Sequence, residues 1–205
     1  MVRRHFYIPL AIGLLVSFGA TAQLLPTYGE ERAGLSAFTF LKLPIDPAST
    51  GVGGASLAMT DHSFGALINP ALISGGNQQG VFSANRALGG GINHDFVALT
   101  KARENGQHIA LTLNSLSTGS ILERTVWQPE GTGATTSAAL TCVGLGVSQA
   151  FSEYFHAGVQ LKYGLEQLGV YRAHNVYLDL GFLYKLDIAD LQFAAALTNF
   201  GPNTP

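Results

Sequence analysis

Few side chains in this sequence have a spacing that supports chemistry. The histidines are scattered, and the single cysteine, Cys142, has no second cysteine for a disulfide or a paired zinc site. The sequence has no His-Glu-x-x-His, the helical spacing that places two imidazoles on one zinc ion, and no Gly-x-Ser-x-Gly motif of a serine hydrolase. We therefore expect no enzyme activity, no metal site and no cofactor.

One glycine run invites comparison with a phosphate loop. Gly51, Gly53 and Gly54 form a Gly-x-Gly-Gly pattern. A phosphate-binding loop of the Walker type continues with Lys-Ser or Lys-Thr, which is missing here. Because glycine has no Cβ, close packing of the backbone is the simpler interpretation.

Three charged residues fall on the polar faces of two adjacent predicted strands. They are Lys162, Glu166 and Asp179. If these faces line the lumen of a barrel, a cross-strand ion pair between Lys162 and Asp179 is expected. Structural support is the simpler role for the three residues, and a path for a solute is the alternative.

The elements that carry these residues are predicted by alternation of apolar and polar side chains. Residues 155–166 alternate throughout, and residues 175–186 repeat the pattern in the other phase. Further strands are expected at 139–151, 109–114 and 191–197, and less regular ones at 80–86 and 93–101. A strand of 155–166 has the length of a tilted membrane crossing, about 9–11 residues.

Composition favours a membrane protein. Charged residues make up 12% of the chain and hydrophobic residues 47%, whereas soluble domains carry about 25% charged residues. After the N-terminus no apolar run is long enough for a membrane helix. We therefore predict a transmembrane antiparallel β-barrel with outer-membrane lipid around it. A soluble two-sheet sandwich is the alternative, although its outward faces should carry more Lys and Glu. The net charge of −2 leaves no basic footprint for nucleic acid.

The N-terminus is predicted to be a cleaved signal peptide, residues 1–22. Arg3-Arg4-His5 forms a basic head, residues 6–18 are apolar, and Ala20-Thr21-Ala22 is a small-x-small cleavage site. The mature chain should then begin near Gln23, and the protein is expected in the cell outer membrane.

The mature chain divides into three predicted parts. Residues 23–46 form an N-terminal segment, extended at 36–43, and residues 80–205 form barrel strands. Residues 47–79 are expected to form a plug inside the barrel: a glycine-rich strand, followed by an apolar helix that begins at Asp61, as its cap, and ends at Asn69-Pro70.

Connection lengths support the barrel. Tight turns are expected at 104–106, 152–153 and 187–190, with longer connections at 168–173 and 117–137 on the other side. Outer-membrane barrels have short periplasmic turns and longer extracellular loops.

The long connection contains the one tryptophan. Trp127 and Arg124 are of the types that anchor protein interfaces, so we predict a partner contact there. The alternative for Trp127 is an aromatic girdle at the membrane surface.

Several stretches, in order, carry a family resemblance. Residues 37–44 (Ala-Phe-Thr-Phe-Leu-Lys-Leu-Pro), 50–55 (Thr-Gly-Val-Gly-Gly-Ala) and 69–72 (Asn-Pro-Ala-Leu) resemble the N-terminal signature of the PorV/PorQ family. That family belongs to the wider FadL-like class of outer-membrane barrels. Residues 158–163, 179–184 and 196–201 resemble strands of the family as well.

The resemblance implies a barrel with an N-terminal hatch and a non-enzymatic accessory role in the type IX secretion system of Bacteroidota-type bacteria. Its partners would be secretion subunits, secreted cargo with C-terminal sorting domains, or lipopolysaccharide-handling proteins. The alternative is a FadL-type channel for hydrophobic solutes. In either case the hatch and ligand path would include these residues: Asn69, Pro70, Ala71, Gly51, Gly53 and Gly54.

The chain departs from the family pattern in two places. Leu72 directly follows Ala71, where many relatives have glycine. The roughly eight strands expected from alternation are too few for a family barrel. We therefore expect only the N-terminal part of a larger barrel.

Overall fold

The computed structural model describes residues 38–59, 64–77, 79–188 and 190–202. They belong to one compact unit, Ala37–Pro205. The predicted signal peptide, its cleavage site and the predicted cap Asp61 lie outside the described residues. No helix within the described ranges is long and apolar enough to cross a membrane.

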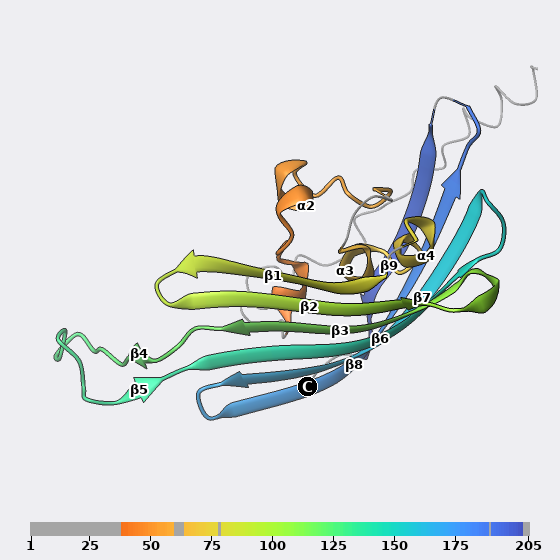
Figure 1. The fold of residues 1–205 in the computed structure, drawn as a ribbon. Helices are drawn as coiled ribbons and strands as arrows, with labels where there is room; N and C mark the ends of the chain where they lie inside the picture. The colour runs from red at the N-terminus through yellow and green to blue at the C-terminus, as the bar shows by residue number, and fades with distance from the viewer. Residues whose placement is uncertain (1–37, 60–63, 78, 189, 203–205) are drawn as a thin grey trace, which may run out of the picture. The chain divides into compact units, whose positions relative to one another are not determined.

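The protein is mostly β, built on one seven-stranded antiparallel sheet with the order β1-β2-β3-β6-β7-β8-β9 (Figure 1). The strands of this sheet are β1 (Gly80–Gly89), β2 (Ile92–Ala102), β3 (Gln107–Ser117), β6 (Ala138–Ala150), β7 (Phe155–Leu168), β8 (Tyr171–Lys185) and β9 (Gln192–Phe200). A small second sheet pairs β4 (Ile121–Leu122) with β5 (Thr135–Thr136). Each of the seven ranges named above as a strand is confirmed as one.

The register of the seven strands aligns apolar side chains across the whole sheet. One row of directly opposed residues runs through every strand: Val81, Leu99, Leu111, Leu145, Leu161, Leu178 and Phe200. Since side chains alternate between the two faces of a strand, this row defines one apolar face. We call it the outer face, and the opposite side the inner face.

The connections agree with the prediction except between β7 and β8, and the long connection predicted at 117–137 is confirmed. Tight turns join β2 to β3, through the 3₁₀ turn η2 (Glu104–Gly106), β6 to β7, and β8 to β9. The longer connection predicted at 168–173 is wrong: Gly169 and Val170 alone join β7 to β8, because Gly169 takes a left-handed backbone (φ 59°) that a tight hairpin turn requires. Residues 118–137 are the one long connection among the described strands, and we call them the tongue.

Short helices replace the predicted extended N-terminal part. Thr39–Lys42 forms the 3₁₀ helix η1, so the extended prediction for 36–43 is wrong in its described part. The glycine-rich strand is also wrong, since Pro47–Gly51 is the helix α2. The Asp46 carboxylate accepts a hydrogen bond from the N–H of Ser49 at 2.6 Å. Pro47 occupies the first turn, where a backbone N–H would have no partner within the helix, so the missing N–H of proline costs nothing.

Two further helical turns follow. α3 (Gly65–Ile68) ends at Asn69-Pro70, which confirms the predicted helix stop. α4 (Leu72–Gly75) begins directly after it and was not predicted. We call the described residues 38–77 the plug.

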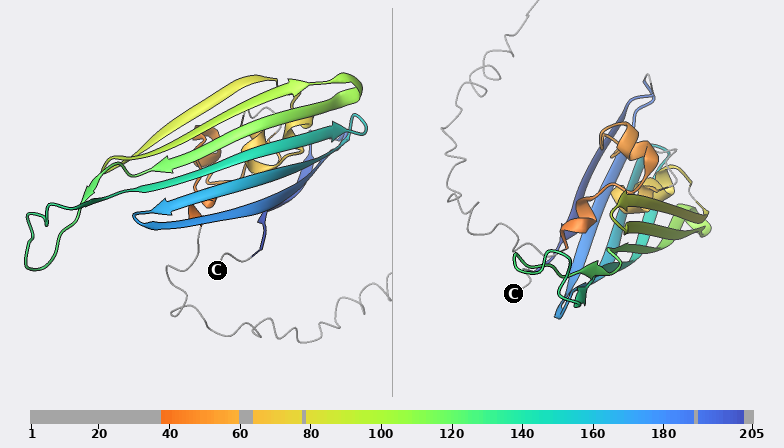
Figure 2. Two further views of the ribbon diagram at one scale, coloured as in Figure 1. Left: turned by 90° about the horizontal axis from the view of Figure 1, so that it is seen from below. Right: turned by 90° about the vertical axis from the view of Figure 1, so that its left-hand side faces the viewer.

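The plug lies against the inner face of the curved sheet (Figure 2). α4 packs on β3, β6, β7 and β8, and Leu72 and Ile73 are fully buried there. The core of the unit is therefore the interface between plug and sheet.

Candidate functional site: the inner face and the plug seat

The sheet has the reverse polarity of a water-soluble antiparallel sheet, whose polar side normally faces solvent. Polar side chains on the inner face are buried: His94, Thr100, His108, Thr112, Asn114, Ser148, His156, Gln160, Lys162, Glu166, Asn175 and Asp179. Large apolar side chains on the outer face are exposed, as Leu145 (58%) and Leu161 (56%) illustrate. The candidate site is therefore the buried polar face and the plug that covers it.

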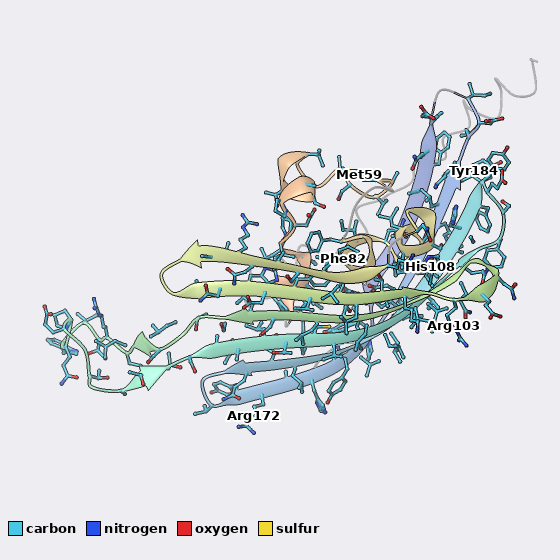
Figure 3. All side chains as sticks on the ribbon, viewed as in Figure 1. Met59, Phe82, Arg103, His108, Arg172 and Tyr184 are labelled. Atoms are coloured by element: carbon cyan, nitrogen blue, oxygen red, sulfur yellow. The ribbon has the colours of Figure 1, made fainter. Side chains whose placement is uncertain are left out.

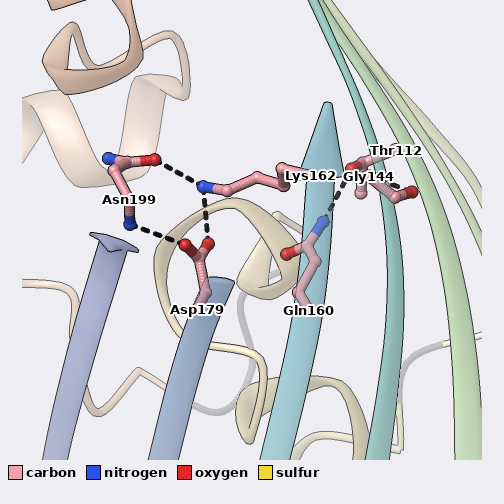
Figure 4. A network of polar contacts seen from close by, with 6 residues as sticks. All are labelled: Thr112, Gly144, Gln160, Lys162, Asp179 and Asn199. Atoms are coloured by element: carbon pink, nitrogen blue, oxygen red, sulfur yellow. Dashed lines mark hydrogen bonds and ion pairs between the residues drawn. The ribbon is translucent and has the colours of Figure 1, made fainter. Parts of the chain in front are cut away.

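Two of the predicted polar residues form an ion pair on the inner face. The Lys162 ammonium lies 2.5 Å from the Asp179 carboxylate and donates to Asn199 Oδ1 at 2.6 Å (Figure 4). Lys162 is 8% exposed and Asp179 1%. The predicted Lys162–Asp179 pair is thus confirmed as a buried contact between β7 and β8.

The same carboxylate fixes the edge strand β9. The register between β8 and β9 shifts between Leu178 and Leu180, and Asn199 has a left-handed backbone (φ 57°) at that point. Its N–H donates to Asp179 Oδ1 at 2.7 Å. Asp179 therefore supplies an acceptor where the regular ladder is interrupted.

Glu166, the third predicted polar residue, holds the plug. Its carboxylate accepts the backbone N–H of Phe38 at 2.6 Å in a buried contact. The Phe38 ring packs edge-on against Tyr177 of β8, with centroids 5.5 Å apart. This pair of contacts fastens the start of the plug to β7 and β8.

The predicted hatch motif makes the second set of contacts that hold the plug on the sheet. Asn69 is fully buried; its Nδ2 donates to the carbonyls of Leu57 and Phe182, both at 3.2 Å, and its Oδ1 accepts the N–H of Ala71 at 3.0 Å. The side chain thus closes the turn between α3 and α4 and ties that turn to β8.

Two glycines of the sheet make room for this turn. A Cβ on Gly158 would lie 2.5 Å from the carbonyl carbon of Pro70, and one on Gly181 would collide with Asn69 Oδ1. Gly158 and Gly181 are opposite one another in β7 and β8. We call these two glycines the seat of the hatch motif. The sequence analysis did not predict them as site residues, although a glycine on the inner face of each of two adjacent strands is a recognisable pattern.

A third fastening, also missed, surrounds α4. Ser74 Oγ lies 2.6 Å from Ser148 Oγ and 3.3 Å from His156 Nδ1. Lys185 donates to the carbonyl of Gly75 at 2.5 Å. Side chains from β6, β7 and β8 therefore form hydrogen bonds with this helix.

The glycine run does not pack as predicted. Among the described residues, nothing lies within 4 Å of a Cβ built on Gly51, Gly53 or Gly54. Gly53 and Gly54 instead have positive φ values, 64° and 86°, after α2. They are turn residues, so their positive φ values explain the glycines better than close backbone packing does.

The tongue carries the predicted partner residues away from the plug. Val126 and Trp127 are 92% and 91% exposed at the turn where Thr125 and Gln128 exchange backbone hydrogen bonds. Arg124 beside them is exposed as well. The aromatic ring of Trp127 is thus presented to the surroundings.

The described part of the chain contains no group of three or more His, Cys, Asp or Glu that could hold a metal ion. Cys142 is buried in β6 and free, as a small residue of a strand. The inner face thus offers hydrogen bonding and packing.

Replacing Gly158 with alanine should loosen the plug, because the new methyl group meets rigid backbone of Pro70. Overpacking of this kind costs about 1–3 kcal/mol. Limited proteolysis in detergent should cut residues 38–77 faster in Gly158→Ala. The control is Gly146→Ala, also on the inner face, where the nearest atom is 3.5 Å away. Equal cleavage rates of the two variants would contradict the close contact between Gly158 and Pro70.

No family model matches the chain, and no curated protein or solved structure gives a significant match.

Proposed function

We propose that this chain is part of a PorV/PorQ-like outer-membrane β-barrel, with the outer face in lipid and the plug held in the lumen. Its role would be that of a non-enzymatic accessory of type IX secretion and cell-surface attachment. The observation that carries the membrane assignment is the reversed polarity of the sheet. The secretion role rests on the family resemblance of residues 37–55 and 69–72.

The outer face has the chemistry of a lipid contact. Exposed apolar patches beyond a few hundred Å² mark interaction surfaces. Here the apolar row through all seven strands is flanked by a second row: Val97, Leu113, Val143, Tyr163 and Val176. These central rows contain no charge. A largely apolar band of this breadth, without charge in its central rows, suits acyl chains better than a protein partner.

Both ends of the band carry residues suited to headgroups. Phe151, Phe182, Tyr184 and Phe193 are exposed near the short-turn end. Arg103 and Arg172 lie at opposite ends of the sheet, with Tyr184 at the other end of β8 from Arg172 (Figure 3). Aromatic girdles and flanking charges are typical of barrels at the membrane surface.

The plug contacts favour an accessory role over a hydrophobic channel. A channel for hydrophobic solutes gated at Asn69-Pro70-Ala71 would require the plug to leave. The plug is fastened at Phe38, Asn69 and Ser74, and the face behind it is mostly polar. A hydrophobic solute gains little from such a lining.

The direct test is co-purification. The protein, as the longest natural form that contains this chain, would be used as bait from detergent-solubilised outer membranes, with mass spectrometry as the readout. Secretion subunits or surface proteins with C-terminal sorting domains are the expected partners. A bait that carries only lipid or fatty acid would overturn the accessory role and favour the channel.

The tongue is the proposed partner contact. Trp127→Ala should weaken co-purification strongly, because a tryptophan at the centre of an interface contributes about 2 kcal/mol or more. The control is Ile188→Ala, which removes an exposed apolar side chain (73%) from the turn between β8 and β9, at the opposite end of the sheet. Unchanged recovery with Trp127→Ala would remove the tongue from the proposal.

A further inference from the structure

A small cavity lies between the plug and the inner face. The plug contributes only apolar side chains to it, and the sheet contributes mostly polar ones. Its lining is Leu41, Ala66, Leu67, Phe96, Thr112, Asn114, Cys142, Gln160 and Lys162. The volume of about 10 Å³ is that of a site for one water-sized molecule.

Two buried amide side chains border this cavity, and each is held by one partner only. Asn114 Oδ1 lies 2.7 Å from His94 Nε2. Gln160 Nε2 donates to Thr112 Oγ1 at 2.7 Å (Figure 4). The second polar atom of each amide, Asn114 Nδ2 and Gln160 Oε1, has no hydrogen-bond partner among the described residues. The two residues are 4% and 1% exposed. Buried polar atoms of this kind almost always have a partner.

This conclusion does not depend on how the amides are oriented. If Asn114 or Gln160 is turned over, its oxygen and nitrogen exchange places, yet one polar atom of the amide is still left over. The occupant must therefore be able both to donate and to accept. Water has this property. A cation does not fit, because it needs several oxygen ligands and would lie next to the positively charged Lys162 ammonium.

We propose that the cavity binds one water molecule, which bridges the Asn114 and Gln160 amides. The water joins two pairs that otherwise end at the cavity, His94–Asn114 and Thr112–Gln160. The pairs come from β2, β3 and β7, next to the Lys162–Asp179–Asn199 contacts on β7, β8 and β9. A polar network would then run from β2 to β7 beneath the plug, beside the Lys162–Asp179–Asn199 contacts.

Because Leu41, Ala66 and Leu67 bring no polar side-chain atom to this cavity, we assign the water to the amide side chains of the sheet. It completes the hydrogen bonding of the inner face and leaves the plug to pack on top. This inference rests on the geometry of the cavity and is independent of the proposed secretion role.

The test is a high-resolution crystal structure of the protein in detergent. We expect one solvent peak within hydrogen-bond distance of both amides. An empty cavity, or amides bonded to each other, would overturn the proposal.

A matched pair of variants tests whether the Gln160 amide binds this water. Gln160→Met keeps the length of the side chain without its polar end, and the peak should disappear. Gln160→Glu keeps an acceptor at the same place, and the peak should remain. A peak that persists unmoved in Gln160→Met would show that Gln160 does not bind the water.

Discussion

Lys162→Met should destabilise the protein by about 3–5 kcal/mol, the usual cost of leaving one partner of a buried ion pair without the other. The Asp179 carboxylate is 1% exposed and would be left buried without the ammonium that lies 2.5 Å away. Urea unfolding in detergent, followed by the circular dichroism of the strands, measures the loss.

The double variant Lys162→Met/Asp179→Leu is the control. With both charges removed, the loss should be smaller than the sum of the two single losses, although Asn199 N–H then lacks its acceptor. Strictly additive losses would mean that the two side chains do not interact in the folded protein.

Leu145→Arg should cost about 2–4 kcal/mol when the protein is folded into lipid vesicles, because the arginine replaces an outward side chain in the middle of the apolar band. Leu145 is opposed by Leu111 on one side and Leu161 on the other. The free energy of unfolding in vesicles is the quantity to compare.

Val126→Arg is the matched control, since Val126 is 92% exposed at the tip of the tongue, beyond the strands. It should change the unfolding free energy little. If Leu145→Arg were as neutral as Val126→Arg, the outer face would be an ordinary solvated surface, where single substitutions change stability by less than about 0.5 kcal/mol.

The strands were predictable because their signal is local. Over residues 155–165 of β7 and 176–184 of β8 every second side chain is apolar, which indicates both the element and the face it presents. Lys162 and Asp179 lie on the inner face of two adjacent strands, which is what made an ion pair predictable. The register pairs Asp179 with Gln160 and Lys162 with Tyr177, so the contact is diagonal.

The plug was predicted less well, for two physical reasons. Asp46 followed by Pro47 is a start signal for the helix α2, but the glycines that come directly after it favour a strand or a turn over a helix. The seat at Gly158 and Gly181 depends on contacts with Pro70 and Asn69, which are far away in the sequence. Periodicity within one segment carries no information about which distant backbone will approach a glycine.

The tight β7–β8 turn shows the same limit. Residues 168–173 contain a single glycine, and the hairpin extends the strands to Leu168 and Tyr171. Cross-strand pairing lengthened both strands past the point where alternation becomes irregular, and so shortened the connection.

The most direct test of the membrane assignment is fluorescence quenching by lipids with brominated acyl chains. Tryptophan would be placed singly by Leu161→Trp on the outer face or by Val170→Trp in the β7–β8 turn, each with Trp127→Phe to remove the native signal. The outer face in lipid predicts strong quenching of Leu161→Trp and weak quenching of Val170→Trp. Unquenched fluorescence from Leu161→Trp, together with quenching by a water-soluble acrylamide, would contradict the account.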